Sequence, residues 1–570
     1  MAKKKNYPLN YVKRFSGLRE MVDMAAKEAG DKPAFRYRVG DKDVSVSYSE
    51  FRLDVLALGT GLSELGVDTE HIAIISENRY DWINVYLAVL CSAGVFVPVD
   101  KDLPDGEKVH VLLHSDSHVL FFSGAQEKFV RENIERLPDI KYFIGLDLEE
   151  DDGDRILSFR ALKARGAKLF VNGDGSYLAK TRDKNELKML VYTSGTTGMA
   201  KGVMLSEHNL ISSVYYGMQV ADVKDSCLSV LPYHHTYEAV PGILVAIHHH
   251  ATVCINDSLK NVLKNLNYYR PEYIYLVPAF AEVFYKRIWA GARAQKKDKI
   301  LRFLIGFSNA LRKIGIDLRG LLFTSVTSNF GGKLKMIVCG GAPIRPETGK
   351  FFDSIGIPLF NGYGITECSP LVSVNREKTN DTSTVGTVLA CCEIRFDDVS
   401  EDGEGEICVR GDIVMLGYYK DPESTAAAFT EDGFFRTGDY GLMNKNGQLV
   451  ITGRKKNLIV LTNGKNIFPE EIENYIYSIP YVEDAIVYSI KNASGQETAL
   501  ASEVYPNADA VKEAGITDVH ARLKEDIEKV CAELPSYKHI SKIYVRDIPF
   551  EKTTSNKIKR SSALYNKNDK

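Results

Sequence analysis

Cysteine is scarce and follows no pattern in this sequence. The 570 residues include nine cysteines, an odd number, and no two of them form a CxxC pair. This distribution gives no disulfide framework and is typical of reduced thiols in a reducing compartment. The basic start of the chain, MAKKKNYPLNYVKRF, is not followed by an apolar stretch, so we expect no secretory signal and a cytoplasmic protein.

Neither sign of charge is in excess, and long apolar runs are absent. Lysine and arginine number 72 against 75 aspartate and glutamate residues, so no nucleic-acid partner is expected. The one uncharged run long enough to suggest a membrane span, residues 82–99, is interrupted by Asn84, Gly94 and Pro98. A span needs about 20 predominantly apolar residues. The run therefore predicts a buried helix that leads into a core strand.

The sequence does contain the alternation of strands and helices that is typical of an α/β protein. Its length favours two or more domains with ample apolar volume to bury. Short β-branched runs such as HIAIISE (71–77) and LKMIVCG (334–340) are followed by helical stretches, the second of which opens at Pro346. The run IPLF (357–360) is expected to lead into a glycine turn. This order predicts doubly wound α/β sheets.

The character of the sequence changes twice towards its C-terminal part. Near Thr384 it becomes a series of short strands and glycine turns, which predicts a β-rich subdomain. After Gly453 a strand and an Asn463–Gly464 turn precede a helix that opens at Pro469. We therefore expect an N-terminal domain over 1–453 with its β-rich part at about 384–453, a hinge at 454–457, and an α+β C-terminal domain over 458–570.

The loop YTSGTTGMAKG, residues 192–202, contains mostly glycine and small or hydroxylated residues, with one lysine, Lys201. It joins two strand-like segments, and the next helix is expected only beyond Ser206. A Walker loop would need Ser or Thr after the lysine, whereas Gly202 and Val203 follow here. The loop can still cradle phosphates, because glycines let backbone amides approach anionic oxygens while the lysine supplies charge. Considered alone, a plain flexible turn is an equal alternative.

Other segments decide between these two interpretations of the loop. Seven of them follow one another along the chain: YTSGTTGMAKGV (192–203), LPYHHTYE (231–238), GGAPI (340–344), NGYGITE (361–367), FRTGD (435–439), GRKKNLIVLTNGKNIFPEEIE (453–473) and KTTSNKIKR (552–560). The series resembles the adenylate-forming (AMP-binding) superfamily, which includes acyl-CoA synthetases, adenylation domains of peptide synthetases and beetle luciferases. The resemblance covers almost the whole chain, and it is greatest to bacterial long-chain fatty acid–CoA ligases.

The resemblance implies a fold and a reaction. The fold is α/β, with a large N-terminal domain of doubly wound subdomains plus a small β-barrel-like subdomain, followed by a small mobile α+β domain. The reaction joins a carboxylate to the α-phosphate of ATP to give an acyl adenylate and pyrophosphate, and a thiol then displaces AMP. ATP, Mg²⁺ and coenzyme A are the implied cofactors. Catalysis of this kind rests on positioning and charge stabilisation.

The resemblance also implies roles for the phosphate-binding residues. The residues carried over to the β- and γ-phosphates are Thr193, Ser194, Gly195, Thr196, Thr197, Gly198 and Lys201. Glu367 is expected to ligate Mg²⁺ together with Thr193 through hard oxygen atoms. Thr366 is expected to donate to the α-phosphate. The residues carried over to the adenine pocket are Gly341, Ala342, Asn361, Gly362 and Tyr363, and those for the ribose are Asp439 and Arg454.

The remaining roles concern the carboxylate and the C-terminal domain. His235, the second histidine of LPYHHTYE, is expected to border the carboxylate, whereas His234 fills a variable position. Lys557 matches the C-terminal lysine that bridges carboxylate and phosphate oxygens in the family. The hinge aligns with Lys456, and Gly464 would face the pantetheine channel after domain rotation. The basic neighbours of Lys557 are expected to include solvated bystanders: Lys552, Lys559 and Arg560.

Three positions depart from the family pattern. Ala200 replaces the usual proline of the loop, Asn457 the usual aspartate after the hinge, and Asn556 the usual glycine before Lys557. Ala200 frees its φ angle and Asn556 can still adopt left-handed geometry, so modest loosening is expected. Asn457 removes a charge near the hinge and is expected to alter the rate of domain motion.

The choice of acid depends on a basic segment at 286–319. It carries ten basic residues against Asp298 and Asp317, with apolar residues at helical spacing. Those apolar residues are Ile300, Leu304, Phe307, Leu311 and Ile314. Either the helix packs on its own domain with a wet basic face, or it contacts an anionic membrane peripherally. An insertion of this kind resembles long-chain fatty acyl-CoA synthetases, which favours a fatty acid.

Three alternatives to a long-chain fatty acid–CoA ligase stay open. The first is a ligase for medium-chain or aryl acids, and the second is an acyl-AMP ligase that delivers to an acyl carrier protein. The third, of another class, is an inactive membrane-associated lipid-binding homologue. The sequence leaves the oligomeric state open between monomer and homodimer.

Overall fold

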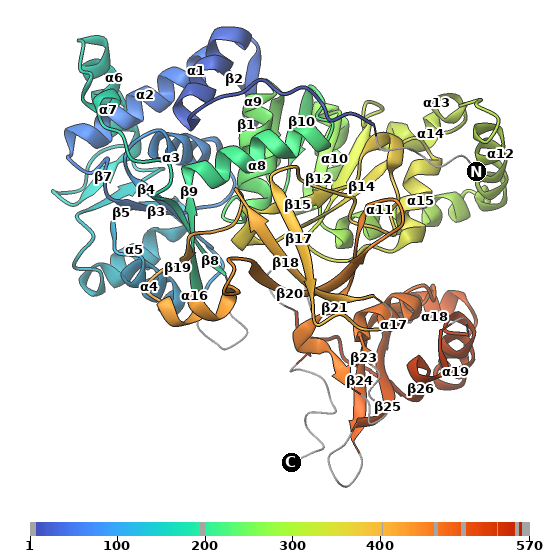
Figure 1. Cartoon of the computed structure of the whole chain (residues 1–570). Coiled ribbons are helices and arrows are strands. Elements are labelled where there is room, and N and C mark those ends of the chain that lie inside the picture. The colour runs from blue at the N-terminus through green and yellow to red at the C-terminus, as the bar shows by residue number, and fades with distance from the viewer. Residues whose placement is uncertain are drawn as a thin grey trace. The chain divides into compact units, whose positions relative to one another are not determined.

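The computed structural model of the chain describes residues 7–193, 200–401, 403–460, 466–491, 497–532, 534–552 and 558–560 (Figure 1). Its internal contacts divide the chain into two compact units. Unit 1 comprises Met1–Ile394, Val409–Phe435 and Asn446–Gln448, and unit 2 comprises Arg395–Cys408, Arg436–Lys445 and Leu449–Lys570. Both units mix helices and strands, so the predicted α/β class is confirmed.

Unit 1 contains a sheet of eight strands in which most neighbours are parallel. Its order is β19 (Gly417–Tyr418), β9 (Lys201–Ser206), β8 (Leu187–Thr193), β4 (Val95–Val99), β3 (His71–Ile75), β5 (Ser117–Phe122), β6 (Tyr142–Gly145) and β7 (Ile156–Ser158). The helices of this part are α1 (Leu18–Ala29), α2 (Tyr48–Glu64), α3 (Tyr80–Leu90), α4 (Asp105–His114), α5 (Glu127–Asn133), α6 (Phe159–Val171), α7 (Ser176–Ala179) and α8 (Glu207–Val220). Figure 1 shows α2 and α6 above these strands and α4 and α5 below them.

The apolar run at 82–99 forms the elements that the sequence predicts. Helix α3 is buried over nearly its whole surface and is followed by the fully buried strand β4. A helix that is apolar on all sides belongs in a core, and β4 pairs in parallel with β3 at the centre of the sheet. In the part of the chain that the structure describes, no helix combines the length and the hydropathy needed to cross a bilayer.

A second sheet of unit 1 has nine strands. Its order is β16 (Thr387–Val388), β15 (Leu371–Val374), β14 (Leu359–Gly364), β13 (Met336–Cys339), β12 (Tyr273–Leu276), β10 (Ser226–Ser229), β11 (Thr252–Ile255), β1 (Pro33–Val39) and β2 (Lys42–Ser47). The accompanying helices are α9 (Val245–His248), α10 (Val262–Tyr269), α11 (Pro278–Ala294), α12 (Asp298–Arg312), α13 (Arg319–Leu322), α14 (Thr324–Thr327) and α15 (Pro346–Ser354). The helix expected at Pro346 begins there, with proline in its first turn.

One prediction about this sheet is wrong. The glycines after IPLF do not form a turn, because β14 continues to Gly364 and pairs with β13 on one side and β15 on the other. The reason is steric: a Cβ atom at Gly364 would lie 2.2 Å from the carbonyl oxygen of Pro370. This glycine allows two backbones to approach closely within the sheet.

The β-rich region and unit 2 follow. A four-stranded sheet has the order β17 (Cys392–Asp397), β18 (Gly405–Gly411), β20 (Phe435–Met443) and β21 (Leu449–Arg454), and α16 (Pro422–Ala428) lies between β19 and β20 in the sequence. The later strands are β22 (Ile459–Val460), β23 (Asn466–Ile467), β24 (Val482–Lys491), β25 (Glu497–Pro506) and β26 (Ile540–Val545). The later helices are α17 (Pro469–Ile476), α18 (Ala508–Glu513) and α19 (Val519–Val530). Helices α17 and α19 pack with β24 and β25 around one apolar core, and α17 opens at Pro469 as predicted.

Candidate active site

The two ends of the glycine-rich loop are held by a β-ladder. Strands β8 and β9 run antiparallel, and Thr193 and Lys201 are the last paired residues on either side of the loop. Helix α8 begins only at Glu207, after Ser206 caps it, so the prediction of a strand-to-strand loop is confirmed. The loop residues predicted to bind phosphate that lie outside the described residues are Ser194, Gly195, Thr196, Thr197 and Gly198.

Lys201 is held by two groups from a distant part of the sequence. Its Nζ donates a hydrogen bond of 2.7 Å to Ser424 Oγ, near the start of α16. The same Nζ lies 4.9 Å from the ring centroid of Tyr418, a cation–π distance. Tyr418 reaches this position because β19 pairs antiparallel with β9. The ammonium group is therefore oriented by β19 and α16.

Tyr418 also contacts the predicted metal ligand. Thr366 and Glu367 lie in a 3₁₀ turn that follows β14, and Tyr418 donates a hydrogen bond of 3.1 Å to Glu367 Oε1. The backbone carbonyl of Glu367 accepts a hydrogen bond of 2.8 Å from the backbone amide of Met415. Burial, and next the Glu367 charge, raise the pKa of Tyr418, so it remains a donor at neutral pH. One tyrosine therefore joins Lys201 and Glu367.

Sequence motifs alone missed Tyr418 and Ser424. Both lie in the segment GYYKDPEST (417–425), in which two tyrosines and a lysine follow a glycine. Nothing in their spacing relates them to Lys201, because the contact depends on the pairing of β19 with β9. An aromatic doublet in an otherwise polar loop is the only local signal.

The residues predicted for the adenine pocket lie at the carboxyl ends of two adjacent parallel strands, where α/β sheets commonly bind ligands. Gly341 and Ala342 follow β13, whereas Asn361, Gly362 and Tyr363 belong to β14. Gly341 has a φ of 83°, a left-handed conformation that favours glycine. The side-chain amide of Asn361 donates to the carbonyl of Thr384 at 3.2 Å, within unit 1.

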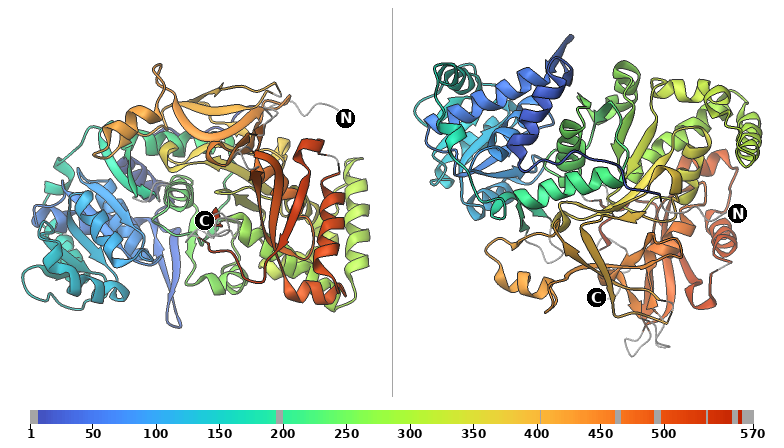
Figure 2. Two further views of the ribbon diagram at one scale, coloured as in Figure 1. Left: turned by 90° about the horizontal axis from the view of Figure 1, so that it is seen from below. Right: turned by 45° about the horizontal axis from the view of Figure 1, so that its top comes forward.

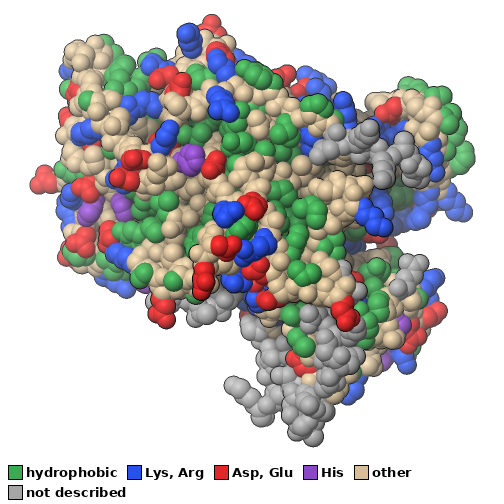
Figure 3. Space-filling view, in the orientation of Figure 1, with side chains coloured by type: hydrophobic (Ala, Val, Ile, Leu, Met, Phe, Trp, Pro, Cys, Tyr) green, Lys and Arg blue, Asp and Glu red, His purple; other side chains and the backbone are tan. Residues whose placement is uncertain are grey.

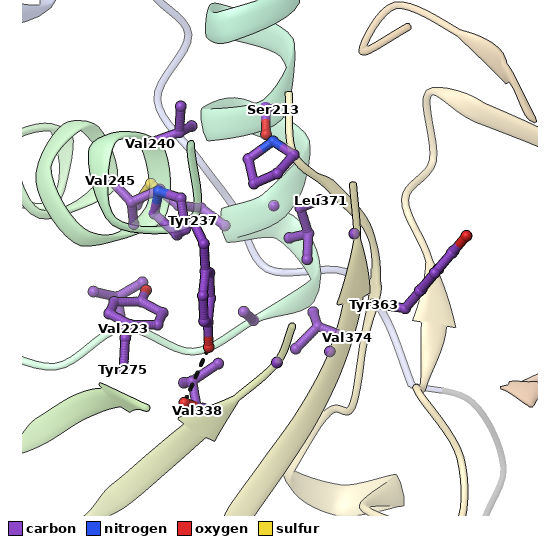
Figure 4. Close-up of a pocket in the computed structure, with 18 of the residues that line it drawn as sticks. Ser213, Val223, Tyr237, Val240, Val245, Tyr275, Val338, Tyr363, Leu371 and Val374 are labelled. Carbon is purple, nitrogen blue, oxygen red and sulfur yellow. Dashed lines mark hydrogen bonds between the residues drawn. The ribbon is translucent and has the colours of Figure 1, made fainter. Parts of the chain in front are cut away.

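A largely apolar pocket, partly open to solvent, adjoins these strand ends (Figure 4). Its lining residues include Gly341, Gly362 and Tyr363 together with apolar side chains from α8, β13 and β15. Ala342 and Asn361 do not line it. Tyr237 donates to the carbonyls of Val338 and Leu276 at 3.2 and 3.4 Å, and in Figure 4 Tyr363 points away from Tyr237. The mostly apolar lining suits a small-molecule site that takes an apolar body.

The two adjacent histidines have different environments. His235 is exposed and lies in the turn that precedes Tyr237, while its ring centroid is 4.2 Å from that of His234. Burial, and next the nearby His235, lower the pKa of His234 well below its usual value. His234 Nε2 lies 3.6 Å from Asp100. His234 is therefore neutral at pH 7, and His235 is the more exposed of the two histidines.

Glu238 is a fully buried carboxyl group in a π-helix, Glu238–Leu244. It accepts a hydrogen bond of 2.5 Å from Ser229 Oγ. Burial raises the pKa of Glu238 to about 8, although the Ser229 hydroxyl and the amides of Leu231 and Val230 favour the charged form. The side chain is therefore largely protonated at neutral pH, and it supports the helix that carries the pocket residues Val240 and Pro241.

Glu238→Gln is expected to change how stability depends on pH. The folded protein holds the Glu238 proton up to about pH 8, whereas the value for the free side chain is 4.5. The folded state therefore binds more protons in this window, and the free energy of unfolding of the wild type falls as pH rises through it. The difference in the free energy of unfolding between the variant and wild type should therefore shift by about 3 kcal/mol in favour of the variant from about pH 5.5 to about pH 8. Denaturant unfolding at both pH values measures this gain, and Glu132→Gln on the exposed face of α5 should show none.

Unit 2 contains the residues predicted for the ribose. Asp439 on β20 and Arg454 on β21 are cross-strand partners, and Arg454 Nε lies 3.0 Å from Asp439 Oδ1. Asp439 is buried, whereas nearly half of the Arg454 side chain is exposed. Burial, and next the charge of Arg454, lower the pKa of Lys456. Gly464 and Lys557 lie outside the described residues.

The basic residues near Lys557 include both paired and exposed side chains, in agreement with the expectation that some of them are solvated. Arg560 donates to both carboxylate oxygens of Glu473 at 2.7 and 2.8 Å and to the carbonyl of Val487 at 3.1 Å. Lys552 Nζ lies 2.9 Å from the buried Asp484. Two of the three therefore hold the C-terminal segment to unit 2, and Lys559 is exposed.

The metal-binding capacity of unit 1 suits Mg²⁺. Among the described residues, no three His, Cys, Asp or Glu side chains are grouped in a way that could hold a metal ion. Glu367 and Thr193 offer a carboxylate and a hydroxyl group, which are hard oxygen donors. Mg²⁺ commonly binds through one or two protein carboxylates and completes its shell with waters and substrate phosphates. These two residues therefore fit Mg²⁺ and do not form a closed protein cage.

Comparison with known families agrees with this geometry. Residues 22–419 match the AMP-binding enzyme family, and residues 456–569 match the AMP-binding enzyme C-terminal domain. The first match spans well over half of the chain and contains Lys201, Glu367 and Tyr418, and the second contains Lys456 and Lys557.

Individual relatives and solved structures match most of this chain. The long-chain-fatty-acid–CoA ligase FadD15 of Mycobacterium bovis is 29% identical over 462 residues, which are 78% of this chain and 75% of that protein. The long-chain-fatty-acid–CoA ligase 5 of Rattus norvegicus is 27% identical over 593 residues, with 95% and 85% covered. The fold resembles ATP-bound MatB from Rhodopseudomonas palustris, with a TM-score of 0.73, 22% identity and coverage of 95% and 97%. It also resembles the anthranilate CoA ligase AuaEII with anthranoyl-AMP, with a TM-score of 0.75, 16% identity and coverage of 98% and 99%. The chain belongs to the family of AMP-binding enzymes.

Proposed function

We propose that the chain is an AMP-forming ligase that activates a long-chain fatty acid with ATP and transfers the acyl group to coenzyme A. The observation that carries this proposal is the pocket of unit 1. Three residues predicted for the adenine site, Gly341, Gly362 and Tyr363, line the same pocket as an apolar wall that includes Tyr237 and Leu371. A nucleotide and an apolar acid could therefore lie side by side.

The first half-reaction places two anions in contact. The carboxylate oxygen attacks the α-phosphorus of ATP, the bond to the pyrophosphate oxygen breaks, and acyl adenylate and pyrophosphate result. Lys201, fixed by Ser424 and Tyr418, would offset charge on the transferred phosphates, and Thr366 would donate to the α-phosphate. Glu367 and Thr193 would hold Mg²⁺, which supplies charge neutralisation when bound.

In the second half-reaction the thiol sulfur attacks the acyl carbonyl carbon, and AMP leaves with the electrons of the acyl–phosphate bond. Lys557 would act in the first half-reaction only, and rotation about the hinge at Lys456 would bring Gly464 to the pantetheine channel. His235, exposed before Tyr237, would border the carboxylate. The proposed division into domains 1–453 and 458–570 with a hinge at 454–457 would allow Lys557 and the thiol to occupy the site in turn.

The substrate class is tested by pyrophosphate release with a panel of acids, with and without coenzyme A. The named ligases among the relatives and the apolar wall of the pocket support a fatty acid. Release with long-chain acids, together with thioester formation from coenzyme A, is the expected result. Preference for medium-chain or aryl acids, or acyl transfer only to a carrier protein, would each contradict it. If no acid-dependent exchange between ATP and pyrophosphate is detected, the result would favour the alternative of an inactive lipid-binding protein.

Gly217→Leu is expected to shift the preference of the protein from long-chain acids towards shorter acids. Gly217 lines the pocket from α8, and a Cβ atom there would lie 3.3 Å from Leu371 Cδ2. A leucine side chain would therefore fill space that an acyl chain needs. We expect kcat/KM for long-chain acids to fall by about 10–200-fold, with shorter acids less affected.

The matched control for this substitution is Gln219→Leu, which adds the same side chain to α8 outside the pocket lining. Parallel losses for acids of every length in Gly217→Leu would argue that the pocket does not hold the acyl chain. The acid panel described above provides the measurement for both variants.

Tyr418→Phe is expected to weaken magnesium binding. The substitution keeps the ring beneath Lys201 and removes the hydroxyl that donates to Glu367. Groups that orient a metal ligand typically contribute 10–100-fold to metal affinity or activity. The Mg²⁺ concentration for half-maximal exchange of ATP with pyrophosphate should rise about tenfold.

Tyr419→Phe is the control for this variant, because the Tyr419 hydroxyl donates to Asp116. It should leave the Mg²⁺ requirement unchanged. A fall in the rate of Tyr418→Phe without any change in the Mg²⁺ requirement would show that Tyr418 does not position Glu367.

A further inference from the structure

Helix α12 exposes an apolar ridge that the fold of unit 1 does not use. Three large side chains of α12 form this ridge, and their exposed fractions are 56% for Ile300, 69% for Phe303 and 44% for Phe307; Ile314, 72% exposed, follows just after the helix ends. The rings of Phe303 and Phe307 are stacked, with centroids 6.1 Å apart and planes inclined by 9°. At 3.6 residues per turn the three helical positions fall within about 60° of the helix circumference.

The side of α12 that packs on the protein is a different one. Leu301 and Ser308 are buried, and Leu304 and Ile305 pack against the apolar cluster of α11, α15 and the neighbouring strands. The apolar residues noted in the sequence at 300–314 therefore belong to two faces of the segment, one buried and one exposed. One stripe anchors the helix to unit 1, and the ridge remains in solvent. Both views of Figure 2 show the helices of 278–327 at an outer edge of unit 1.

The segment that carries the ridge is rich in basic residues. Of the ten in the segment 286–319, Arg312 pairs with Asp353 and Arg319 pairs with Asp317 and Asp353, and Arg302 lies over the ring of Trp289. The other seven are exposed, and no described carboxylate forms an ion pair with them: Lys286, Arg287, Arg293, Lys296, Lys297, Lys299 and Lys313. Figure 3 shows hydrophobic side chains along the outer margin of the lobe formed by α12–α14, with Lys and Arg side chains beneath them.

We infer that this ridge and the exposed basic residues of its segment bind the surface of an anionic lipid bilayer. An exposed apolar ridge costs free energy in water, and a helix with aromatic residues beside lysines lies in the plane of a membrane interface. The cations without an ion pair favour an anionic bilayer over other binding partners. The anionic headgroups would attract each cation while the ridge enters the boundary between headgroups and acyl chains. The inference does not rest on the proposed function, since lipid binding needs neither ATP nor coenzyme A.

The test is cosedimentation of the full chain with vesicles of phosphatidylcholine, with or without phosphatidylglycerol. Wild type should bind the anionic vesicles and release them as salt is raised. Phe303→Ser with Phe307→Ser should lower the partition constant by about tenfold or more, because two rings no longer enter the lipid. Lys296→Glu with Lys299→Glu should lower it by about tenfold on anionic vesicles and little on neutral ones.

Matched double variants away from the ridge provide the controls. Val39→Ser with Val171→Ser removes two exposed apolar side chains, and Lys128→Glu with Lys168→Glu reverses two exposed charges. Both should bind like wild type. Phe303→Trp gives a second readout, an emission shift to the blue on addition of anionic vesicles.

Three results would overturn the inference. The first is unchanged binding by the Phe303 and Phe307 variant, and the second is equal binding to neutral and anionic vesicles. The third is a dimer in lipid-free buffer that dissociates when these phenylalanines are replaced, because the ridge would then be covered by a second copy of the chain.

Discussion

Replacing Lys557 by alanine is expected to lower the rate of acyl-adenylate formation by about 10²–10³-fold, the effect of losing one preorganised donor to a developing charge. The conversion of supplied acyl adenylate to the thioester should remain nearly unchanged. The difference arises because the lysine would bridge carboxylate and phosphate oxygens only while they react with each other. Exchange of ATP with pyrophosphate measures the first half-reaction, and thioester formation from synthetic acyl adenylate measures the second.

The residues on either side of 553–557 support this prediction. Lys552 and Ile558 form an antiparallel bridge, and the amide of Lys559 donates to the carbonyl of Glu551 at 2.8 Å. Ile558 packs beside Ile486 and Phe550. The described ends of the segment are therefore fixed to one another and to unit 2.

Lys559→Ala is the control, because it removes an exposed lysine two residues from Lys557. It should retain both half-reactions. Equal losses in both half-reactions of Lys557→Ala would contradict the proposed role, since they would indicate a general defect of the C-terminal domain.

The α/β class and several element boundaries could be predicted because they depend on local signals. Pro346 and Pro469 open their helices, since proline fits the first turn of a helix. The buried run at 82–99 becomes α3 and β4 because apolar residues on every side leave no face for solvent. The ends of the phosphate loop follow from the strand patterns on either side of it.

The parts that could not be predicted depend on contacts between distant segments. Tyr418 contacts Glu367 and lies under Lys201 only because β19 adds to the edge of the eight-stranded sheet. The glycines of β14 signal a turn in isolation, yet Gly364 serves the close approach of Pro370. The two apolar faces of α12 are indistinguishable by spacing, because packing against α15 and its neighbours decides which one is buried.

Arg560→Met is expected to destabilise unit 2 by about 3–5 kcal/mol at about pH 8, where Glu473 of the wild type is ionised, because this is the usual cost of leaving one buried charge without its partner. Glu473 is buried and accepts, besides Arg560, the amide of Val487 at 2.7 Å. Burial raises the pKa of Glu473 to about 7 even with Arg560 present, and loss of the guanidinium would raise it further. The variant's folded state then binds the proton over a wider range than the unfolded chain, so its free energy of unfolding falls as pH rises from about 4.5.

The measurement is denaturant unfolding of wild type and Arg560→Met at about pH 5.5 and about pH 8, with the larger loss expected at the higher pH. Adding Glu473→Gln to Arg560→Met should recover part of the loss and remove its pH dependence, because the buried group can no longer ionise. Arg522→Met is the matched control, since Arg522 pairs with Asp526 on the exposed side of α19 at 2.8 Å, and such pairs contribute less than about 1 kcal/mol. Equal losses in both arginine variants, at both pH values, would mean that Arg560 does not anchor the segment that carries Lys557. Because Arg560 holds the described end of the segment that contains Lys557, Arg560→Met is also expected to slow adenylate formation more than thioester formation.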